Sequence, residues 1–270
     1  MVKIIAVCNQ KGGVGKTAVT VGLAEVMSQR LGQRVLLIDA DPQANATSIL
    51  GVEEPERTLN DVLAGDKETK EVPPGVLAAA ISPSGPSWQP ESDKGAPWTA
   101  IDVVASERNL AAREQDQMLG REHRLRTACE GAVDSYDVVL IDCPPSLGQL
   151  TVNALVAADR ALLVTEARAS SVEGLAEIIK TLGSVRRLFN PALSLAGVVI
   201  NRLRKDRKDQ AEWLTTLEED YETYLLSPYL PERERFAAAN SAAMPLGSYK
   251  SDSRELLNNL ETLAASLLKD

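Results

Sequence analysis

The sequence predicts an α/β fold in which a mostly parallel, twisted β-sheet carries helices on both faces. Short, continuously apolar runs rich in β-branched residues alternate along the chain with longer segments of helical periodicity. Unbroken apolar runs are typical of strands buried on both faces, and strand–helix–strand repeats favour right-handed parallel crossovers. The expected strands are residues 3–9, 34–40, 101–106, 136–143, 160–167 and 195–201.

The helices expected between these strands are residues 16–31, 107–130, 149–158, 171–189 and 207–222. A final segment, 250–269, places four leucines at helical spacing, and we expect it to dock on the core. These leucines are Leu256, Leu260, Leu263 and Leu267. A helix lying on a membrane surface is the alternative. Such helices usually carry a polar face rich in Lys and Arg, whereas the charges of this segment nearly cancel.

Residues 67–100 differ in character from the rest of the chain. They contain six of the fourteen prolines, together with Trp88 and Trp98. We therefore expect an irregular surface insertion within a single domain that spans residues 1–270. A tolerated insertion is one interpretation, and a partner-binding loop anchored by the two tryptophans is the other.

The composition argues against several classes of protein. The chain has 270 residues and a formal net charge of −9, so its overall field repels nucleic acid, and any DNA contact needs a local basic patch. The three cysteines are scattered without C-x-x-C spacing, which argues for a reducing compartment and against a zinc site. No apolar stretch approaches the roughly 18 residues that span a membrane. We expect a cytoplasmic protein without a membrane partner.

The residues that follow the first expected strand form a phosphate-binding motif, NQKGGVGKTA. Its three glycines allow the backbone to curl so that successive N–H groups surround an anion, and the following helix adds its positive end. Lys16 would contact the β- and γ-phosphates, and the hydroxyl of Thr17 would bind Mg²⁺. The motif predicts a P-loop NTPase. The expected nucleotide-binding residues of the loop are Gly12, Gly13, Val14, Gly15, Lys16, Thr17 and Ala18.

Carboxylates stand at the ends of two other expected strands. Asp39 and Asp41 are two residues apart in VLLIDAD, so on an extended chain they point the same way. Asp142 ends the apolar run VVLID, which is the position at which P-loop proteins hold Mg²⁺ or its waters. Aspartate as a general strand terminator is the alternative interpretation. In a parallel sheet all these ends lie at the carboxyl edge, where ligands bind.

Four segments together resemble the ParA/MinD family of deviant Walker A ATPases, and more closely the small, Soj-type ParA partition proteins. They are KGGVGKT, IDADPQANATSILG, DVVLIDCPPSLG and LPERERFAAANSAAMPL, which occur in the family's order over most of the chain. The stretch DPQANATS marks the ParA side of the family. The resemblance implies that ATP and Mg²⁺ are the cofactors.

The resemblance gives the second lysine of the loop, Lys11, a role in nucleotide binding and catalysis. In this family the extra lysine reaches across a dimer interface to the phosphates of the partner's ATP. A cation supplied in this way ties charge stabilisation to dimerisation, as an arginine finger does. Lys16 would stabilise the same charge, Asp41 would orient the attacking water, and Asp39 and Asp142 would serve the metal. Hydrolysis is expected to be slow without a stimulating partner.

The resemblance also implies how the base and DNA are bound. Asn201, at the end of a late strand, and Pro231 match positions at which the family recognises adenine. ATP-bound dimers of the family bind DNA without sequence preference through exposed basic residues. The matching candidates are Arg202, Arg204, Arg207 and Arg235. A solvated basic helix start is the alternative interpretation of these arginines.

We therefore expect an ATP-driven homodimeric switch that partitions plasmid or chromosomal DNA. A ParB-like adaptor would stimulate its ATP hydrolysis, and the ATP-bound form would lie on the nucleoid. One alternative is a MinD-like membrane-cycling ATPase, which a basic amphipathic tail would favour. Another is a metabolic relative, such as the nitrogenase-type iron protein or a dethiobiotin-synthetase-like ligase. A further alternative is an ATPase that positions a cargo other than DNA.

Overall fold

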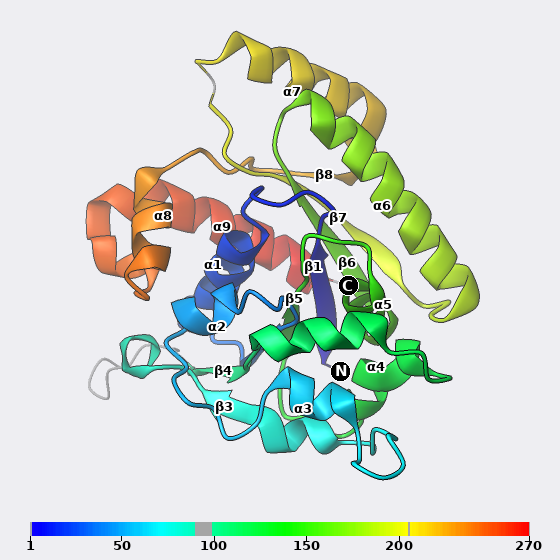
Figure 1. Cartoon of the computed structure of the whole chain (residues 1–270). Coiled ribbons are helices and arrows are strands. Elements are labelled where there is room, and N and C mark those ends of the chain that lie inside the picture. Colours follow the sequence, from blue (N-terminus) through cyan, green and yellow to red (C-terminus); the bar gives the residue numbers. More distant parts are fainter. Residues whose placement is uncertain (1, 90–98, 205, 270) are drawn as a thin grey trace.

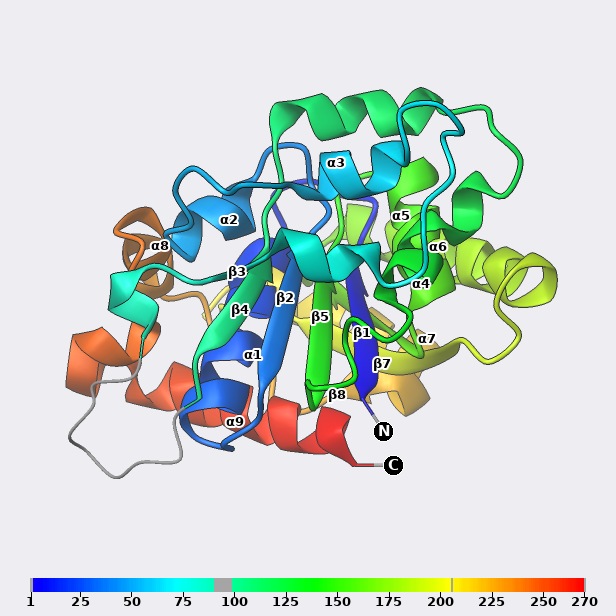
Figure 2. The same cartoon turned by 90° about the horizontal axis from the view of Figure 1, so that it is seen from below.

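A computed structural model describes residues 2–89, 99–204 and 206–269 of the chain. Within these residues, eight strands form one sheet in the order β3-β4-β2-β5-β1-β6-β7-β8, and only β3 runs antiparallel to its neighbour. Figures 1 and 2 show helices on both faces of this sheet, which confirms the predicted fold class. The strands are β1 (Lys3–Cys8), β2 (Val35–Asp39), β3 (Ile81–Pro83), β4 (Ile101–Val104), β5 (Val138–Asp142), β6 (Arg160–Thr165), β7 (Ser194–Ile200) and β8 (Leu225–Leu226).

Helices connect and cover these strands. The α-helices are α1 (Lys16–Gln29), α2 (Asn45–Ile49), α3 (Leu59–Ala64), α4 (Arg124–Cys129), α5 (Gln149–Ala157), α6 (Ala169–Leu188), α7 (Lys208–Tyr221), α8 (Glu234–Ser241) and α9 (Arg254–Leu268). Short 3₁₀ helices are η1 (Val76–Ala80), η2 (Pro86–Trp88), η3 (Arg108–Gln115), η4 (Arg121–His123), η5 (Glu222–Tyr224) and η6 (Leu246–Ser253). None of the described helices is long and apolar enough to cross a membrane.

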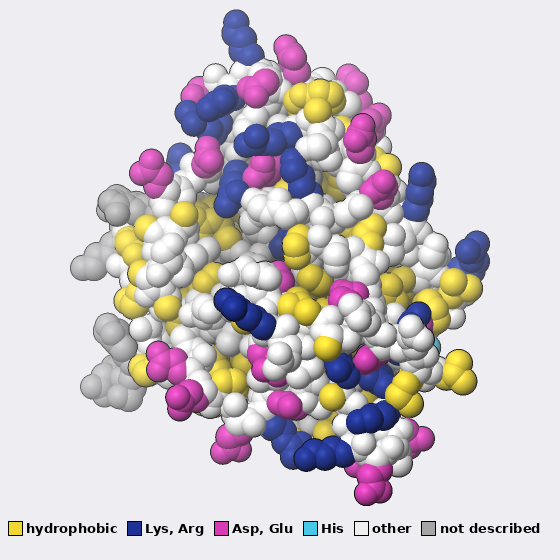
Figure 3. Space-filling view, in the orientation of Figure 1, with side chains coloured by type: hydrophobic (Ala, Val, Ile, Leu, Met, Phe, Trp, Pro, Cys, Tyr) yellow, Lys and Arg dark blue, Asp and Glu magenta, His cyan; other side chains and the backbone are white. Residues whose placement is uncertain are grey.

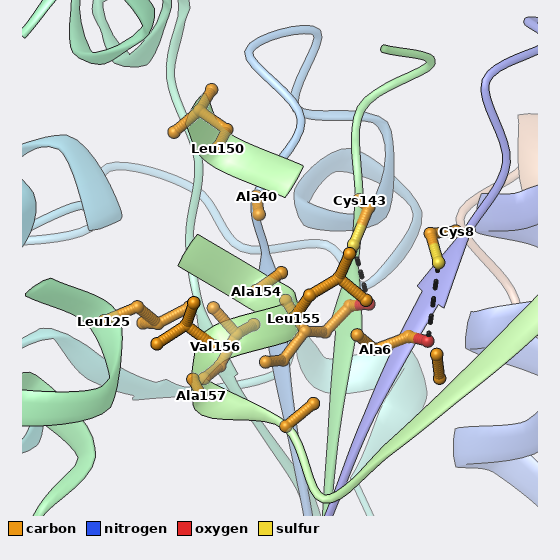
Figure 4. Packing of buried hydrophobic residues seen from close by; sticks show 14 of the residues in the cluster. Ala6, Cys8, Ala40, Leu125, Cys143, Leu150, Ala154, Leu155, Val156 and Ala157 are labelled. Carbon is orange, nitrogen blue, oxygen red and sulfur yellow. Dashed lines mark hydrogen bonds between the residues drawn. The ribbon is translucent and has the colours of Figure 1, made fainter. Parts of the chain in front are cut away.

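Two hydrophobic cores lie on opposite faces of the sheet, because alternate residues of a strand point to opposite sides. In β1, Ile5 and Val7 belong to the core that α1 and α9 cover. Ala6 and Cys8 belong to the core under α4, α5 and α6. Figure 4 shows part of this second core, with Cys8 and Cys143 near the upper ends of β1 and β5, where these strands lead into the loops of the carboxyl edge.

The close approach of α9 to α1 depends on Gly22. A β-carbon at this position would lie 2.9 Å from Cδ1 of Leu260 and 3.2 Å from the ring of Phe236. Leu260 and Leu263 are fully buried, and the side chain of Leu256 is 1% exposed. The predicted docking of the C-terminal segment on the core is therefore confirmed, and the α-helix itself begins at Arg254.

Two predicted segments differ from the structure. The helix expected over 107–130 is divided into η3, η4 and α4, and Gly120 adopts a left-handed φ of 74° in the break. Part of the segment expected to be irregular forms η1, the edge strand β3 and η2. Trp88 is only 1% exposed, and its indole N–H donates to the carbonyl of Ile49 at 2.8 Å. Trp98 lies in residues 90–98, outside the described residues.

Candidate nucleotide-binding site

The predicted phosphate loop connects β1 to α1 at the carboxyl edge of the sheet. Asn9 fixes its start, because its side-chain amide donates to the carbonyl of Val164 at 2.6 Å and its oxygen accepts the N–H of Lys11 at 3.0 Å. Gly13 and Gly15 adopt left-handed φ values of 80° and 85°. Such conformations favour glycine and turn successive N–H groups toward a common centre, as an anion nest requires.

Lys16 begins α1 and is buried, with 6% of its surface exposed. Its ammonium group lies 3.4 Å from the carbonyl oxygen of Lys11, so the side chain folds back over the loop. A buried ammonium group needs a partner of opposite charge. A phosphate group in the loop would supply that charge.

Asp142 lies at the end of β5, fully buried, opposite Asp39 of β2 and Val7 of β1 in the strand register. It accepts hydrogen bonds from the hydroxyls of Thr17 at 2.7 Å and Thr20 at 3.0 Å. Burial, together with the negative charge of Asp39, raises the pKa of Asp142 above its ordinary value. A divalent cation would compensate that buried charge, and Mg²⁺ prefers one or two carboxylates together with hydroxyl and phosphate oxygens. The pair of Thr17 and Asp142 fits Mg²⁺.

Asp39 holds the loop that follows β2. Its carboxylate accepts the N–H and hydroxyl of Thr47 at 2.8 and 2.7 Å and the N–H of Asp41 at 3.1 Å. Burial raises the pKa of Asp39, although its hydrogen bonds with Thr47 act in the opposite direction. Both oxygens of Asp39 therefore already accept hydrogen bonds from the loop. A role of this carboxylate in binding the metal stays a prediction.

Asp41 follows β2 at the carboxyl edge of the sheet and has 7% of its surface exposed. One carboxylate oxygen accepts the N–H of Gln43 at 2.9 Å, and the backbone carbonyl accepts the hydroxyl of Ser106 at 2.7 Å. These contacts fix the backbone that follows the carboxylate. The arrangement leaves the other carboxylate oxygen without a hydrogen bond among the described residues, so it can accept one from a water molecule.

A cavity of about 1150 Å³ opens beside the phosphate loop, between the end of β7 and α8. Its lining includes Ala18, Asn201 and Pro231, three of the residues predicted to bind the nucleotide, and the aromatic rings of Tyr229 and Phe236. The amide of Asn201 donates to the carbonyl of Val14 at 2.9 Å. Its side-chain oxygen is buried and has no partner in the described part of the chain, so it can accept an N–H from a ligand.

The predicted DNA-binding arginines are not equivalent in the structure. The guanidinium of Arg202 contacts the phosphate loop, whereas Arg204 pairs with Asp206 at 3.2 Å. Arg207 is exposed, and the side chain of Arg235 lies outside the described residues. Figure 3 shows Lys and Arg mixed with Asp and Glu over the upper part of this face. A role of these arginines in DNA binding stays a prediction.

Sequence reasoning missed several polar residues of the site. Thr20 lies one turn beyond Thr17 in α1 and shares its carboxylate partner. Ser106 and Glu166 each follow a buried strand, and that position was the signal that could have identified them. Ser170, which contacts Lys11, had no such signal, because it lies three residues beyond the expected strand 160–167 and just before the expected helix 171–189.

Comparison with known proteins assigns the chain to a family. A family model described as an AAA domain matches residues 2–195. Soj of Bacillus subtilis is 32% identical over 258 residues, which cover 94% of each chain. The chromosome partitioning protein ParA of Caulobacter vibrioides is 34% identical over 92% of this chain and 87% of its own. The chain belongs to the ParA/MinD family. The predicted resemblance to ParA-type ATPases is thereby confirmed.

Solved structures of similar proteins share the fold of this ParA-family chain. The complex of a Cyanothece McdA variant with ATP is 25% identical, covers 98% of this chain and 96% of its own, and has a TM-score of 0.81. A cobyrinic acid a,c-diamide synthase from Mycobacterium smegmatis, with bound ADP and magnesium, is 29% identical, with coverage of 93% and 96% and a TM-score of 0.72.

Proposed function

We propose that this ParA-family protein is an ATP-dependent dimerising ATPase that partitions plasmid or chromosomal DNA. The observation that carries the proposal is a phosphate loop that contains two lysines, Lys11 and Lys16, and is followed by the hydrogen bond between the hydroxyl of Thr17 and Asp142. Similarity to Soj and to a chromosome partitioning ParA over most of the chain supports the same function. The protein would act in the cytoplasm and lie on the nucleoid when ATP is bound.

ATP is the nucleotide that the cavity favours. The amide of Asn201 already donates to the carbonyl of Val14, so the group that remains for a base is the unpaired acceptor oxygen. Adenine offers an amino donor at position 6, whereas guanine offers an oxygen there, so a guanine placed with this edge toward Asn201 would leave the buried acceptor unpaired. Pro231 and the two aromatic residues of the lining provide apolar surface for the ring.

Mg²⁺ would be held by the hydroxyl of Thr17 and, directly or through water, by Asp142, and it would neutralise charge on the transferring phosphate. The residues of the chain divide the remaining work. The loop N–H groups and Lys16 bind the phosphates, and Asp41 orients the attacking water. Lys11 supplies a second positive charge to the nucleotide of the partner subunit. Two copies of the chain would then enclose two nucleotides.

Non-specific DNA binding would follow from dimerisation. Arg204, Arg207 and Arg235 are the basic residues for this contact, with a ParB-like adaptor as the partner that stimulates hydrolysis. The net charge of −9 makes this contact weak and sensitive to salt.

A gel-shift experiment on random duplex DNA tests the proposal. It compares ATP with ADP at two salt concentrations. The proposal predicts retardation that requires ATP and decreases with salt. Arg207→Ala should weaken this retardation. Arg187→Ala, in the last turn of α6, is the control and should leave it unchanged. No retardation at low salt would contradict DNA partition, and ATP-dependent sedimentation with liposomes would instead support a membrane-cycling ATPase.

A further inference from the structure

Two consecutive residues after β7 hold two consecutive carbonyl groups of the phosphate loop. The side-chain amide of Asn201 donates to the carbonyl of Val14 at 2.9 Å. The guanidinium of Arg202 donates to the carbonyl of Gly13 at 2.5 Å. With both carbonyl groups held from outside, the N–H groups of the loop are left to face an anion.

Arg202 makes this contact from an unusual backbone conformation. Its φ is 52°, in the left-handed region that residues with long side chains rarely adopt. Such a conformation persists only where the surroundings enforce it, and it is concentrated at functional sites. The loop approaches closely here, since a β-carbon on Gly15 would lie 2.4 Å from the amide nitrogen of Asn201 and 3.8 Å from Nε of Arg202.

A buried carboxylate fixes the guanidinium from the other side. Glu166, the first residue after β6, is only 5% exposed. One of its oxygens lies 3.3 Å from Nη1 of Arg202, and the other lies 2.6 Å from Nε of Arg168. Because the carboxylate offsets the charge of the guanidinium, Arg202 can lie against the phosphate loop without a phosphate group of its own.

We propose that Arg202, held by Glu166, is a positioning residue that preorganises the phosphate loop for the triphosphate. This inference rests on the proposed function and deepens it. It gives Arg202 a role in nucleotide binding in place of the role in DNA binding that the family resemblance implies. Asn201 lines the cavity proposed for the base, and Arg202 donates a hydrogen bond to the phosphate loop beside it. The end of β7 therefore contributes both to recognition of the base and to the conformation of the loop.

The test measures the affinity of the full chain for a fluorescent ATP analogue, and its displacement by ATP and by inorganic tripolyphosphate. Arg202→Ala should weaken the binding of ATP and of tripolyphosphate by the same factor, roughly tenfold or more, because the lost hydrogen bond involves a charged donor. Arg202→Lys should recover part of this loss, since an ammonium group can still donate to Gly13 but lacks the planar guanidinium geometry with which Nη1 contacts both Gly13 and Glu166. Glu166→Gln should cause a smaller loss. Arg187→Ala, at the far end of α6, is the matched control and should bind like wild type.

Thermal unfolding separates this role from a general loss of stability, because Arg202→Lys should melt close to wild type while its affinity is reduced. Unchanged affinity of Arg202→Ala for tripolyphosphate would overturn the inference, as would a loss confined to ATP, which indicates a contact with the base. Unchanged nucleotide affinity with lost DNA retardation would make Arg202 a DNA contact instead. Failure of the wild-type protein to bind ATP would overturn the proposed function itself.

Discussion

The ammonium group of Lys11 donates a hydrogen bond to the hydroxyl of Ser170 at 2.5 Å. Ser170 lies in the first turn of α6 of the same chain, so in this protomer the lysine is folded against its own subunit. A lysine that serves the nucleotide of a partner subunit has to leave this hydroxyl. Under the proposed function, the contact therefore opposes dimerisation by a small amount.

Replacement of Ser170 should make the ATP-dependent dimer more stable. In Ser170→Ala, Lys11 loses its partner in the monomer, and a single exposed hydrogen bond corresponds to roughly 1 kcal/mol. Because both subunits of the dimer lose this bond, the dimer dissociation constant should fall by roughly thirtyfold. Analytical ultracentrifugation with ATP and Mg²⁺ measures this constant. Ser184→Ala, in the same helix but a few turns away, is the control and should not change it. Weaker dimerisation of Ser170→Ala would mean that this hydroxyl supports the dimer.

Replacement of Asp41 should block hydrolysis and preserve the dimer. Asp41→Asn retains a side-chain oxygen for the N–H of Gln43, so the loop keeps its hydrogen bond while the carboxylate that orients water is lost. We expect kcat to fall by roughly 10²-fold or more. Phosphate release measures hydrolysis, and light scattering measures the mass of the complex. A variant that stays monomeric in excess ATP and Mg²⁺ would count against the role of Asp41 in positioning water.

The stability of the protein should decrease as pH rises from about 4.5 to about 7 because of Glu25. This residue of α1 accepts the N–H groups of Leu246 and Gly247 at 2.8 and 2.7 Å, and burial raises its pKa from 4.5 to about 7. The folded state then binds the proton more tightly than the unfolded state. The stabilising effect is complete below pH 4.5 and is lost as pH rises to 7, by roughly 3 kcal/mol in all.

Denaturant unfolding of wild type and Glu25→Gln at several pH values tests this prediction. The variant cannot titrate at this position, so the difference in unfolding free energy between the two proteins should change across the window in favour of the variant. A difference that stays constant between pH 4.5 and 7.5 would show that the pKa of Glu25 is the same in the folded and unfolded states.

The strands that hold the site were predictable, whereas the shortest elements were not. Runs such as VVLI, residues 138–141, are apolar at every position, which is typical of a strand buried on both faces. β8 has two residues and α2 has five, which is too few to show a period. Trp88 was expected in an irregular surface segment because prolines surround it in the sequence. The sequence pattern did not indicate that its ring is buried.

The phosphate loop was predictable from its glycines and lysines, whereas the contact that braces it was not. The hydrogen bond from Arg202 to the carbonyl of Gly13 depends on a backbone φ of 52° at Arg202. An arginine rarely adopts this conformation, and no pattern of neighbouring residues indicates it. The pairing of Glu166 with Arg202 depends on how β6 and β7 lie side by side. Both features arise from packing between segments that are distant in sequence.

The most direct test of the account measures the mass of Lys11→Ala by light scattering, with ATP or ADP and Mg²⁺, beside wild type and Lys16→Ala. The account predicts that wild type doubles its mass with ATP only. Lys11→Ala should bind ATP nearly as well as wild type but remain a monomer, and Lys16→Ala should bind no ATP. Dimerisation of Lys11→Ala equal to that of wild type would contradict the claim that each subunit lends a lysine to the nucleotide of its partner.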